Sequence, residues 1–252
     1  AEQQATLFED QAMRTPNPVQ KNELLTKARQ QYDALLKAKK EQIDKETDPR
    51  KQDQLRVAFF ELKFRVAEFI WTREPGEDMD LLELTDRHAG DRQRAERLMR
   101  DAYRYFREIV TEGGAWRKEM DSAPDVEKRY LDTGIADKMQ NLVAHADYRV
   151  ACTGYYIAYL IKTDNSFNVV LIAPGTKVPA VVARLAKEPF GLGDEGAAAA
   201  VQSTSPVTVA GGLSKEKADQ LAKALQDDGA TAAVEPEKDG LLKAAAAKFE
   251  KV

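Results

Sequence analysis

The chain has 252 residues, a length that suits one large domain or two modest ones. Its net charge of −4 argues against a general nucleic-acid binder, which would be basic overall, so we do not expect a nucleic-acid partner. No apolar run reaches the roughly 18 residues that a membrane span needs, and we expect a soluble protein. A single cysteine, Cys152, excludes a disulfide framework and a cysteine metal site.

Helical periodicity extends over residues 1–163, which predicts an all-helical first domain. Pro16 and Pro18 precede its first clear helix. Apolar residues then recur at spacings of three and four, which marks one buried face: Leu24, Leu25, Ala28, Tyr32, Leu35 and Leu36. A second helix is expected after Asp48, which can cap it, and Pro49, which suits a first helical turn.

The second helix has apolar residues on two sides. One stripe is formed by Phe60, Phe64, Ala67 and Trp71, and the other by Phe59, Leu62, Val66 and Phe69. A helix that is apolar on two sides is packed on two sides, so this one is predicted to lie inside a bundle or a stack of helical hairpins. Glu74-Pro75-Gly76 is expected to end it.

A third helix is predicted over residues 91–110, ending at Gly113-Gly114. One face is apolar, and the opposite face carries a stripe of four arginines: Arg97, Arg100, Arg104 and Arg107. Guanidinium groups in a row could bind carboxylates or phosphates of a partner. The ordinary interpretation of such a stripe is a solvated face whose charges pair with the neighbouring acids Glu96, Asp101 and Glu108.

A fourth helical region is predicted over residues 126–162, with a break near Gly134. Its end carries four tyrosines, which form either a contact patch or the core that seats a second domain: Tyr148, Tyr155, Tyr156 and Tyr159. Pairs such as Ala28-x-x-x-Tyr32 and Ala102-x-x-x-Phe106 resemble tetratricopeptide-type helical hairpins. No regular repeat of about 34 residues emerges, and an antiparallel helical bundle would need similar patterns.

The pattern changes at Asn165. Strands are predicted at 167–172, 206–210 and 231–234, and helices at 178–187, at 197–201 and after the capping residue Ser214, up to Gly229. The order strand-helix-helix-strand-helix-strand predicts a small α+β domain at residues 166–236, and residues 237–252 form a helical tail. The predicted fold class is therefore α+β overall, with all-helical hairpins or a bundle at the N-terminal side.

Residues 167–234 resemble the C-terminal domain of the bacterial ribosomal stalk protein. The resemblance rests on Phe167-x-Val169-Val170-Leu171, Lys177-Val178, Gly191-Leu192-Gly193 and Gly212-Leu213-Ser214-Lys215-Glu216-x-Ala218, followed by Leu221, Leu225, Gly229-Ala230 and Val234. It implies a surface that binds translational GTPases, made of Lys177, Val178, Val182, Arg184, Gly191, Leu192 and Gly193. The final helix, glycine and strand would also suit a SPOR-like peptidoglycan-binding fold.

Two departures from the stalk family bear on function. After the Gly-Leu-Gly corner the family has Leu-Lys-Glu-Ala-Lys, whereas this chain has Asp194-Glu195-Gly196-Ala197-Ala198. The family's N-terminal dimerisation domain and hinge are replaced by the helical region. We therefore expect the fold of the stalk domain to be kept without its role in elongation.

Motifs for catalysis and cofactor binding are missing. Ala173-Pro174-Gly175-Thr176-Lys177 lacks the Gly-Lys pair of a phosphate loop. His88 and His145 have no ligand spacing around them. The acids Asp78, Asp80, Glu83 and Asp86 lack the order of a calcium loop. No catalytic residue, metal or cofactor is predicted.

These observations predict a non-enzymatic protein–protein interaction module that serves as a scaffold or assembly subunit, in a homo- or hetero-oligomeric complex. A translation- or ribosome-associated factor is the alternative, and an enzyme with a site between domains is a third, supported only by the general habit of clefts to bind ligands. Because the chain begins at Ala1, a cytoplasmic chain and an exported mature chain both stay open.

Overall fold

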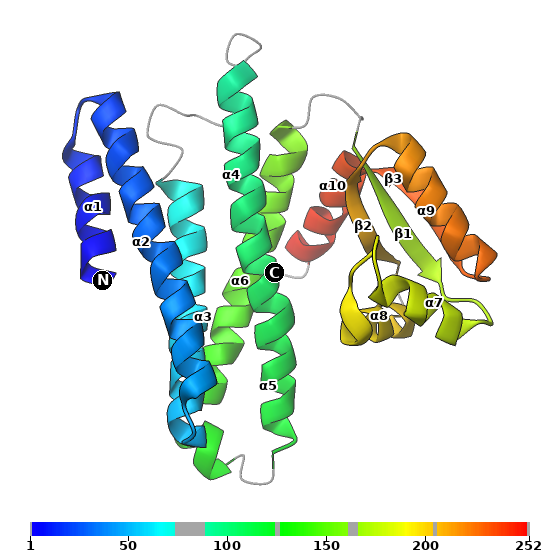
Figure 1. The fold of residues 1–252 in the computed structure, drawn as a ribbon, viewed down its shortest axis with the longest axis horizontal. Coiled ribbons are helices and arrows are strands. Elements are labelled where there is room, and N and C mark those ends of the chain that lie inside the picture. The colour runs from blue at the N-terminus through cyan, green and yellow to red at the C-terminus, as the bar shows by residue number, and fades with distance from the viewer. Residues whose placement is uncertain (1, 74–88, 124–126, 161–165, 204–205, 251–252) are drawn as a thin grey trace. The chain divides into compact units, whose positions relative to one another are not determined.

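The structure, a computed structural model, describes residues 2–73, 89–123, 127–160, 166–203 and 206–250 (Figure 1). The chain divides into unit 1, made of Ala1–Leu160 with Ala245–Val252, and unit 2, Ile161–Ala244. The predicted α+β class with a helical N-terminal region is confirmed. The predicted domain limits stay predictions.

Unit 1 starts with a helical hairpin of α1 (Glu2–Arg14) and α2 (Pro18–Lys45). The Asn17 side chain accepts hydrogen bonds from the backbone N–H groups of Val19 and Gln20 and so caps α2, whose first residue, Pro18, has no N–H that would need an acceptor. The two helices pack along their length, and the ring of Tyr32 is fully buried.

The third helix, α3 (Pro49–Thr72), begins at the predicted cap: Asp48 accepts hydrogen bonds from the N–H groups of Arg50 and Lys51. It contacts α2, α4 and α6, so the prediction of an inner helix is confirmed. Its two apolar stripes meet aromatic partners: Phe64 of one packs edge-on against Phe106, and the ring centroid of Phe69 of the other lies 5.3 Å from that of Tyr32. The expected end at Glu74-Pro75-Gly76 lies outside the described residues.

The predicted stop at Gly113-Gly114 is wrong. Helix α4 (Ala89–Glu108) continues through a π-helical turn, η2 (Ile109–Gly113), directly into α5 (Gly114–Asp121). Gly113 has helical backbone angles and is buried, and a Cβ there would lie 3.0 Å from Met139 Cε. The small residue therefore allows a close approach between this turn and the next long helix, and it does not end the helical path.

The predicted break near Gly134 is confirmed. A second π-helical turn, η3 (Glu127–Leu131), precedes Gly134, which has a φ of +67°, and α6 (Ile135–Leu160) follows. Near the end of α10 (Glu237–Phe249), Lys248 Nζ donates to Asp147 Oδ1, and the Phe249 ring centroid lies 6.1 Å from that of Tyr148. Among the helices described, none combines the length and the apolar character that crossing a membrane requires.

Unit 2 is built on an antiparallel sheet in the order β2-β1-β3, made of β1 (Phe167–Ala173), β2 (Val207–Leu213) and β3 (Thr231–Pro236). Helices α7 (Val178–Ala186) and α8 (Gly193–Gln202) connect β1 to β2, and α9 (Lys215–Asp227) connects β2 to β3. The predicted order of strands and helices is confirmed. Helix α8 begins earlier than the predicted residue 197.

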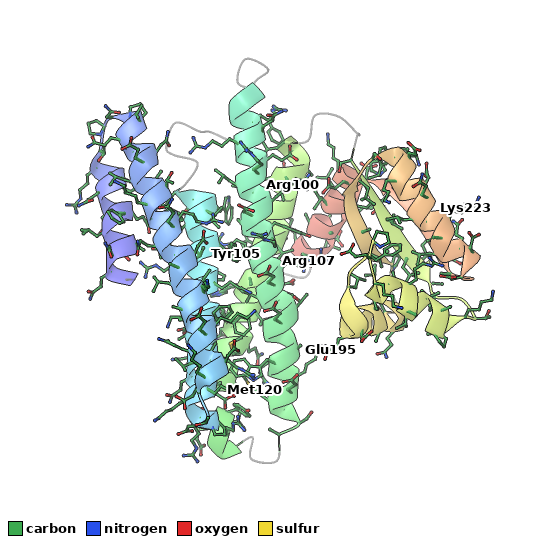
Figure 2. The ribbon with its side chains drawn as sticks, viewed as in Figure 1. Arg100, Tyr105, Arg107, Met120, Glu195 and Lys223 are labelled. Carbon is green, nitrogen blue, oxygen red and sulfur yellow. The ribbon has the colours of Figure 1, made fainter. Side chains whose placement is uncertain are left out.

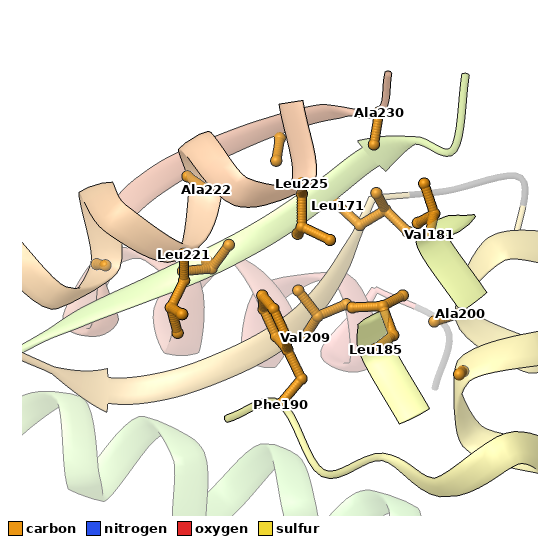
Figure 3. Close-up of a cluster of buried hydrophobic side chains, with 14 residues drawn as sticks. Leu171, Val181, Leu185, Phe190, Ala200, Val209, Leu221, Ala222, Leu225 and Ala230 are labelled. Atoms are coloured by element: carbon orange, nitrogen blue, oxygen red, sulfur yellow. The ribbon is translucent and has the colours of Figure 1, made fainter. Parts of the chain in front are cut away.

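The core of unit 2 lies between one face of the sheet and helices α7, α8 and α9. Figure 3 shows Leu171 and Val209 from the strands pointing toward Leu185, Phe190 and Leu225. These side chains are nearly or fully buried. Burial of a large aliphatic side chain contributes about 1.5–3 kcal/mol, so a core of this kind accounts for the folding of a small sheet domain.

The opposite face of the sheet is covered by the first turns of α10. The α10 residue Gly240 lies against the sheet side chains Asn168 and Glu235. Ser166 donates a 2.5 Å hydrogen bond to Glu237 at the start of α10, and the backbone N–H of Glu237 donates to the Ser166 carbonyl. The first turns of α10 therefore pack on part of the sheet face that is opposite the core of unit 2.

Candidate protein-binding surfaces

The candidate residues on unit 2 come together on α7 and the corner that follows it. Lys177 is the residue before the first turn of α7, and Val178, Val182 and Arg184 are on the helix itself. The corner, Gly191-Leu192-Gly193, follows α7 and leads into α8, which packs against α7. The candidate residues of unit 2 therefore belong to α7 and to the corner after it, and their role as a GTPase-binding site stays a prediction.

The outer face of α7 is apolar. Val181 and Leu185 point into the core, as a surface helix requires. The outward positions carry Pro179, Ala180 and Ala183 together with Val178, whose exposed fraction is 37 %. A helix on the surface of a small domain normally presents charged and polar residues to water, and on this one Arg184 is the sole charged residue.

Arg184 is held at the edge of this face by an ion pair with Asp228, the C-cap residue of α9. Arg184 Nη2 donates to Asp228 Oδ1 at 3.2 Å, and Nε donates to Oδ2. The hydrogen bond from Arg184 holds the pKa of Asp228 below its ordinary value and raises the pKa of Arg184. This guanidinium is therefore positioned by α9 and is only partly available to a partner.

The corner is set by backbone geometry. Gly191 and Gly193 have φ values of +65° and +68°, a region that side chains disfavour. Between them, the backbone N–H of Leu192 donates to the Leu185 carbonyl at 3.0 Å, and the Leu192 side chain packs on the core. Leu192 thus anchors the corner against the end of α7, and the two glycines form its exposed surface.

The two acids that follow the corner, Asp194 and Glu195, occupy positions that suit negative charge. Because α8 begins at Gly193, Asp194 and Glu195 lie in its first turn, where the helix dipole stabilises negative charge. Both are exposed, and Glu195 is labelled in Figure 2. The surface beside the corner is therefore acidic, whereas the start of α7 is basic.

In unit 1, the four arginines of α4 share one side of the helix, and Figure 2 labels Arg100 and Arg107 along it. Of the acids expected to pair with them, Glu96 binds Arg100 at 2.9 Å and Asp101 lies 3.5 Å from Arg104. Glu108 instead binds Lys63 of α3 at 2.8 Å. The expectation of a fully paired solvated face therefore holds for only part of the stripe.

The sequence did not predict two ion pairs of α3, each with one buried member. Lys63 is nearly buried beside the rings of Phe59 and Phe60, and Asp53, also on α3, accepts a 2.6 Å hydrogen bond from Arg129. The presence of these charged residues among the apolar positions of an inner helix indicates that each needs a partner. The partners are distant in the sequence, so the sequence alone does not identify them.

Other candidate sites receive no support from the described residues. Within the described ranges, no group of three or more His, Cys, Asp or Glu side chains could hold a metal ion. His145 is exposed on α6, and His88 with the acidic group Asp78, Asp80, Glu83 and Asp86 lies outside the described residues. Of the four tyrosines, Tyr156 packs against Trp71, while Tyr148, Tyr155 and Tyr159 are exposed.

Comparison with known proteins finds no family model that matches this chain, and no curated protein or solved structure that is similar to it.

Proposed function

We propose that the chain is a non-enzymatic assembly subunit that binds another protein through the outer face of α7 in unit 2. The observation that carries this proposal is the exposure of Val178, Pro179, Ala180 and Ala183 on a helix with a single charged residue. Apolar surface of this kind is stabilised when a partner covers it, and such patches commonly mark protein-binding sites.

The composition of this face indicates what it binds. Pro179, Ala180 and Ala183 are small or compact, so the backbone of a partner helix can approach α7 closely. Exposed Lys177 and Lys187 lie at the two ends of the helix. A partner with a short apolar ridge flanked by acidic side chains would match both features.

The proposal is tested by affinity capture from an extract of the source organism, comparing the wild type with Ala183→Glu. The substitution places a charge at the centre of the apolar face, so a stoichiometric partner should be lost. Gln220→Glu is the matched control, because it adds the same charge at an exposed position of α9. Equal recovery of the partner by both variants would refute the α7 surface.

A second candidate function is the binding of a translational GTPase by the same surface. It is favoured by the presence of Lys177, Val178 and Val182 at the start and along α7, with the Gly191-Leu192-Gly193 corner after that helix, as the resemblance to the stalk protein implies. Two departures oppose it: Glu195 and Ala198 stand where that family has lysines, and Asp194 adds a further acid beside the corner. Binding to a purified GTPase that disappears in Lys177→Ala with Val182→Ala would favour this candidate.

Unit 1 serves, in this proposal, as the scaffold that presents further contacts. Its helices are joined pairwise by short connections, α1 to α2 and α2 to α3. A tetratricopeptide-like stack of hairpins stays a prediction. The catalytic alternative is not proposed, since no motif in the sequence supports it.

A further inference from the structure

We propose that the arginine stripe of α4 is a second protein-binding surface, and that it takes an acidic segment of a partner protein. The stripe consists of Arg97, Arg100, Arg104 and Arg107. The stripe belongs to unit 1 and the α7 surface to unit 2. The two proposals are therefore independent, and either can be refuted without the other.

Packing fixes which side of α4 carries the stripe. Helix α4 contacts α3 and α6, and its inward side chains, including Met99, Ala102 and Phe106, are fully buried. Arg97, Arg104 and Arg107 are exposed, and Arg100 is partly exposed. Ten residues of helix separate the first and last arginines, so the row is about 15 Å long.

The neighbouring acids do not neutralise this row. Glu96 pairs with Arg100, but Asp101 is shared between Arg104 and Arg29 of α2. Glu108 is bound to the buried Lys63. Among the residues that the structure describes, the Arg97 and Arg107 side chains pair with no acid, and the Arg104 side chain is 60 % exposed. Positive charge is therefore in excess along one straight row.

Guanidinium groups in such a row recognise carboxylates or phosphates, and the surroundings favour carboxylates. The stripe is a single row with Glu96 and Asp101 beside it, and the chain as a whole is acidic. A duplex nucleic acid is broad and highly charged, so it would be repelled by these flanking acids. A peptide segment with one row of acidic side chains fits between them, and arginines are frequent anchors of protein interfaces.

The test uses the full chain and a fluorescent synthetic helical peptide whose glutamates repeat at spacings of three, four and three, as the arginines do. Fluorescence anisotropy at low salt measures its Kd. Arg97→Glu with Arg107→Glu should weaken binding by at least about tenfold, because two attractions become repulsions. Lys37→Glu with Lys40→Glu is the control, since it changes the net charge equally at exposed positions of α2.

Binding by the wild type, loss in the stripe variant and retention in the control would support the proposal, with circular dichroism showing that both variants are folded. If peptide binding were weakened equally in the two variants, the effect would come from net charge alone, and the proposal would be overturned. It would also be overturned by absence of binding, by equal binding of a glutamine version of the peptide, or by tighter binding of duplex DNA. Self-association that depends on the stripe would assign it to a second copy instead.

Discussion

Lys63 Nζ lies 2.8 Å from Glu108 Oε2 and 3.4 Å from Glu112 Oε2, and its side chain is only 7 % exposed. Glu108 is the last residue of α4, and Glu112 lies in the π-helical turn that follows. The ammonium group also lies 5.1 Å from the centroid of the Phe59 ring. A single lysine of α3 therefore pairs with two acids at the point where α4 gives way to the π-helical turn.

Replacement of Lys63 tests this arrangement. Lys63→Ala should lower the free energy of unfolding by about 2 kcal/mol, because it removes both the ion pairs and the packing of the side-chain stem on the phenylalanine rings. Lys63→Met keeps the stem and should cost about half as much. Urea unfolding monitored by circular dichroism measures both. An alanine variant as stable as the wild type would show that the ion pairs contribute nothing.

Gly175 approaches the backbone at Gly229 so closely that a side chain has no room. A Cβ at Gly175 would lie 1.8 Å from the Gly229 carbonyl oxygen, and its φ is +68°. We expect Gly175→Ala to destabilise unit 2 by more than about 2 kcal/mol, through backbone strain and steric overlap.

Gly193→Ala is the matched comparison, since Gly193 has the same φ and open space around it. It should cost about 1 kcal/mol, from backbone strain alone. Thermal unfolding compares the two variants. Equal losses of stability would mean that the close approach at Gly229 is not maintained in solution.

The Arg184–Asp228 ion pair makes a small, pH-dependent contribution to stability. The pKa of Asp228 is lowered by its hydrogen bond from Arg184, so the contribution is present above the ordinary aspartate pKa of about 4 and is lost as pH falls through the lowered pKa. Asp228→Asn should cost no more than about 0.5 kcal/mol at neutral pH, because Arg184 is substantially exposed. The difference in Tm between wild type and variant should shrink in acid. A constant difference would contradict the ion pair.

Tyr32 joins α2 to α1, since its hydroxyl donates a 3.0 Å hydrogen bond to Glu9. Burial, followed by the charge of Glu9, raises the pKa of Tyr32. The stability that protonated Tyr32 contributes to the folded state is therefore fully present below the ordinary tyrosine pKa of about 10. It is lost as pH rises through the raised pKa.

Tyr32→Phe should cost about 1–2 kcal/mol at neutral pH, because the bond has a charged acceptor. The loss should become smaller in alkali, where the wild type itself is weakened. Chemical unfolding at neutral and alkaline pH measures this change. A variant that is as stable as the wild type at neutral pH would show that the hydrogen bond contributes nothing.

Local signals predicted most of the helices and strands, and long-range contacts explain what was missed. The caps at Asp48 and Ser214 act on residues two or three positions away, so they can be read from the sequence. The role of Gly113 depends on Met139 of another helix, and Glu112, one of the two acids that bind Lys63, is 49 positions away from it. Such pairings arise from the packing of whole helices, which periodicity alone does not specify.

The candidate surfaces show the same division. Periodicity placed the four arginines on one face of α4. Whether the neighbouring acids neutralise them depends on other helices, because Arg29 also pairs with Asp101 and Lys63 pairs with Glu108. The corner after α7 was predicted from its glycines, whereas the role of Asp194 depends on where α8 begins.

Site-specific photo-crosslinking at Ala183 tests the central claim most directly. A photoreactive amino acid is placed at Ala183, on the exposed face of α7, and in a separate variant at Gln220 of α9, and each is expressed in the source organism. The α7 surface predicts a discrete covalent adduct with one or a few proteins from position 183 and none from position 220. No adduct at position 183, or the same adducts from both positions, would contradict protein binding through this face.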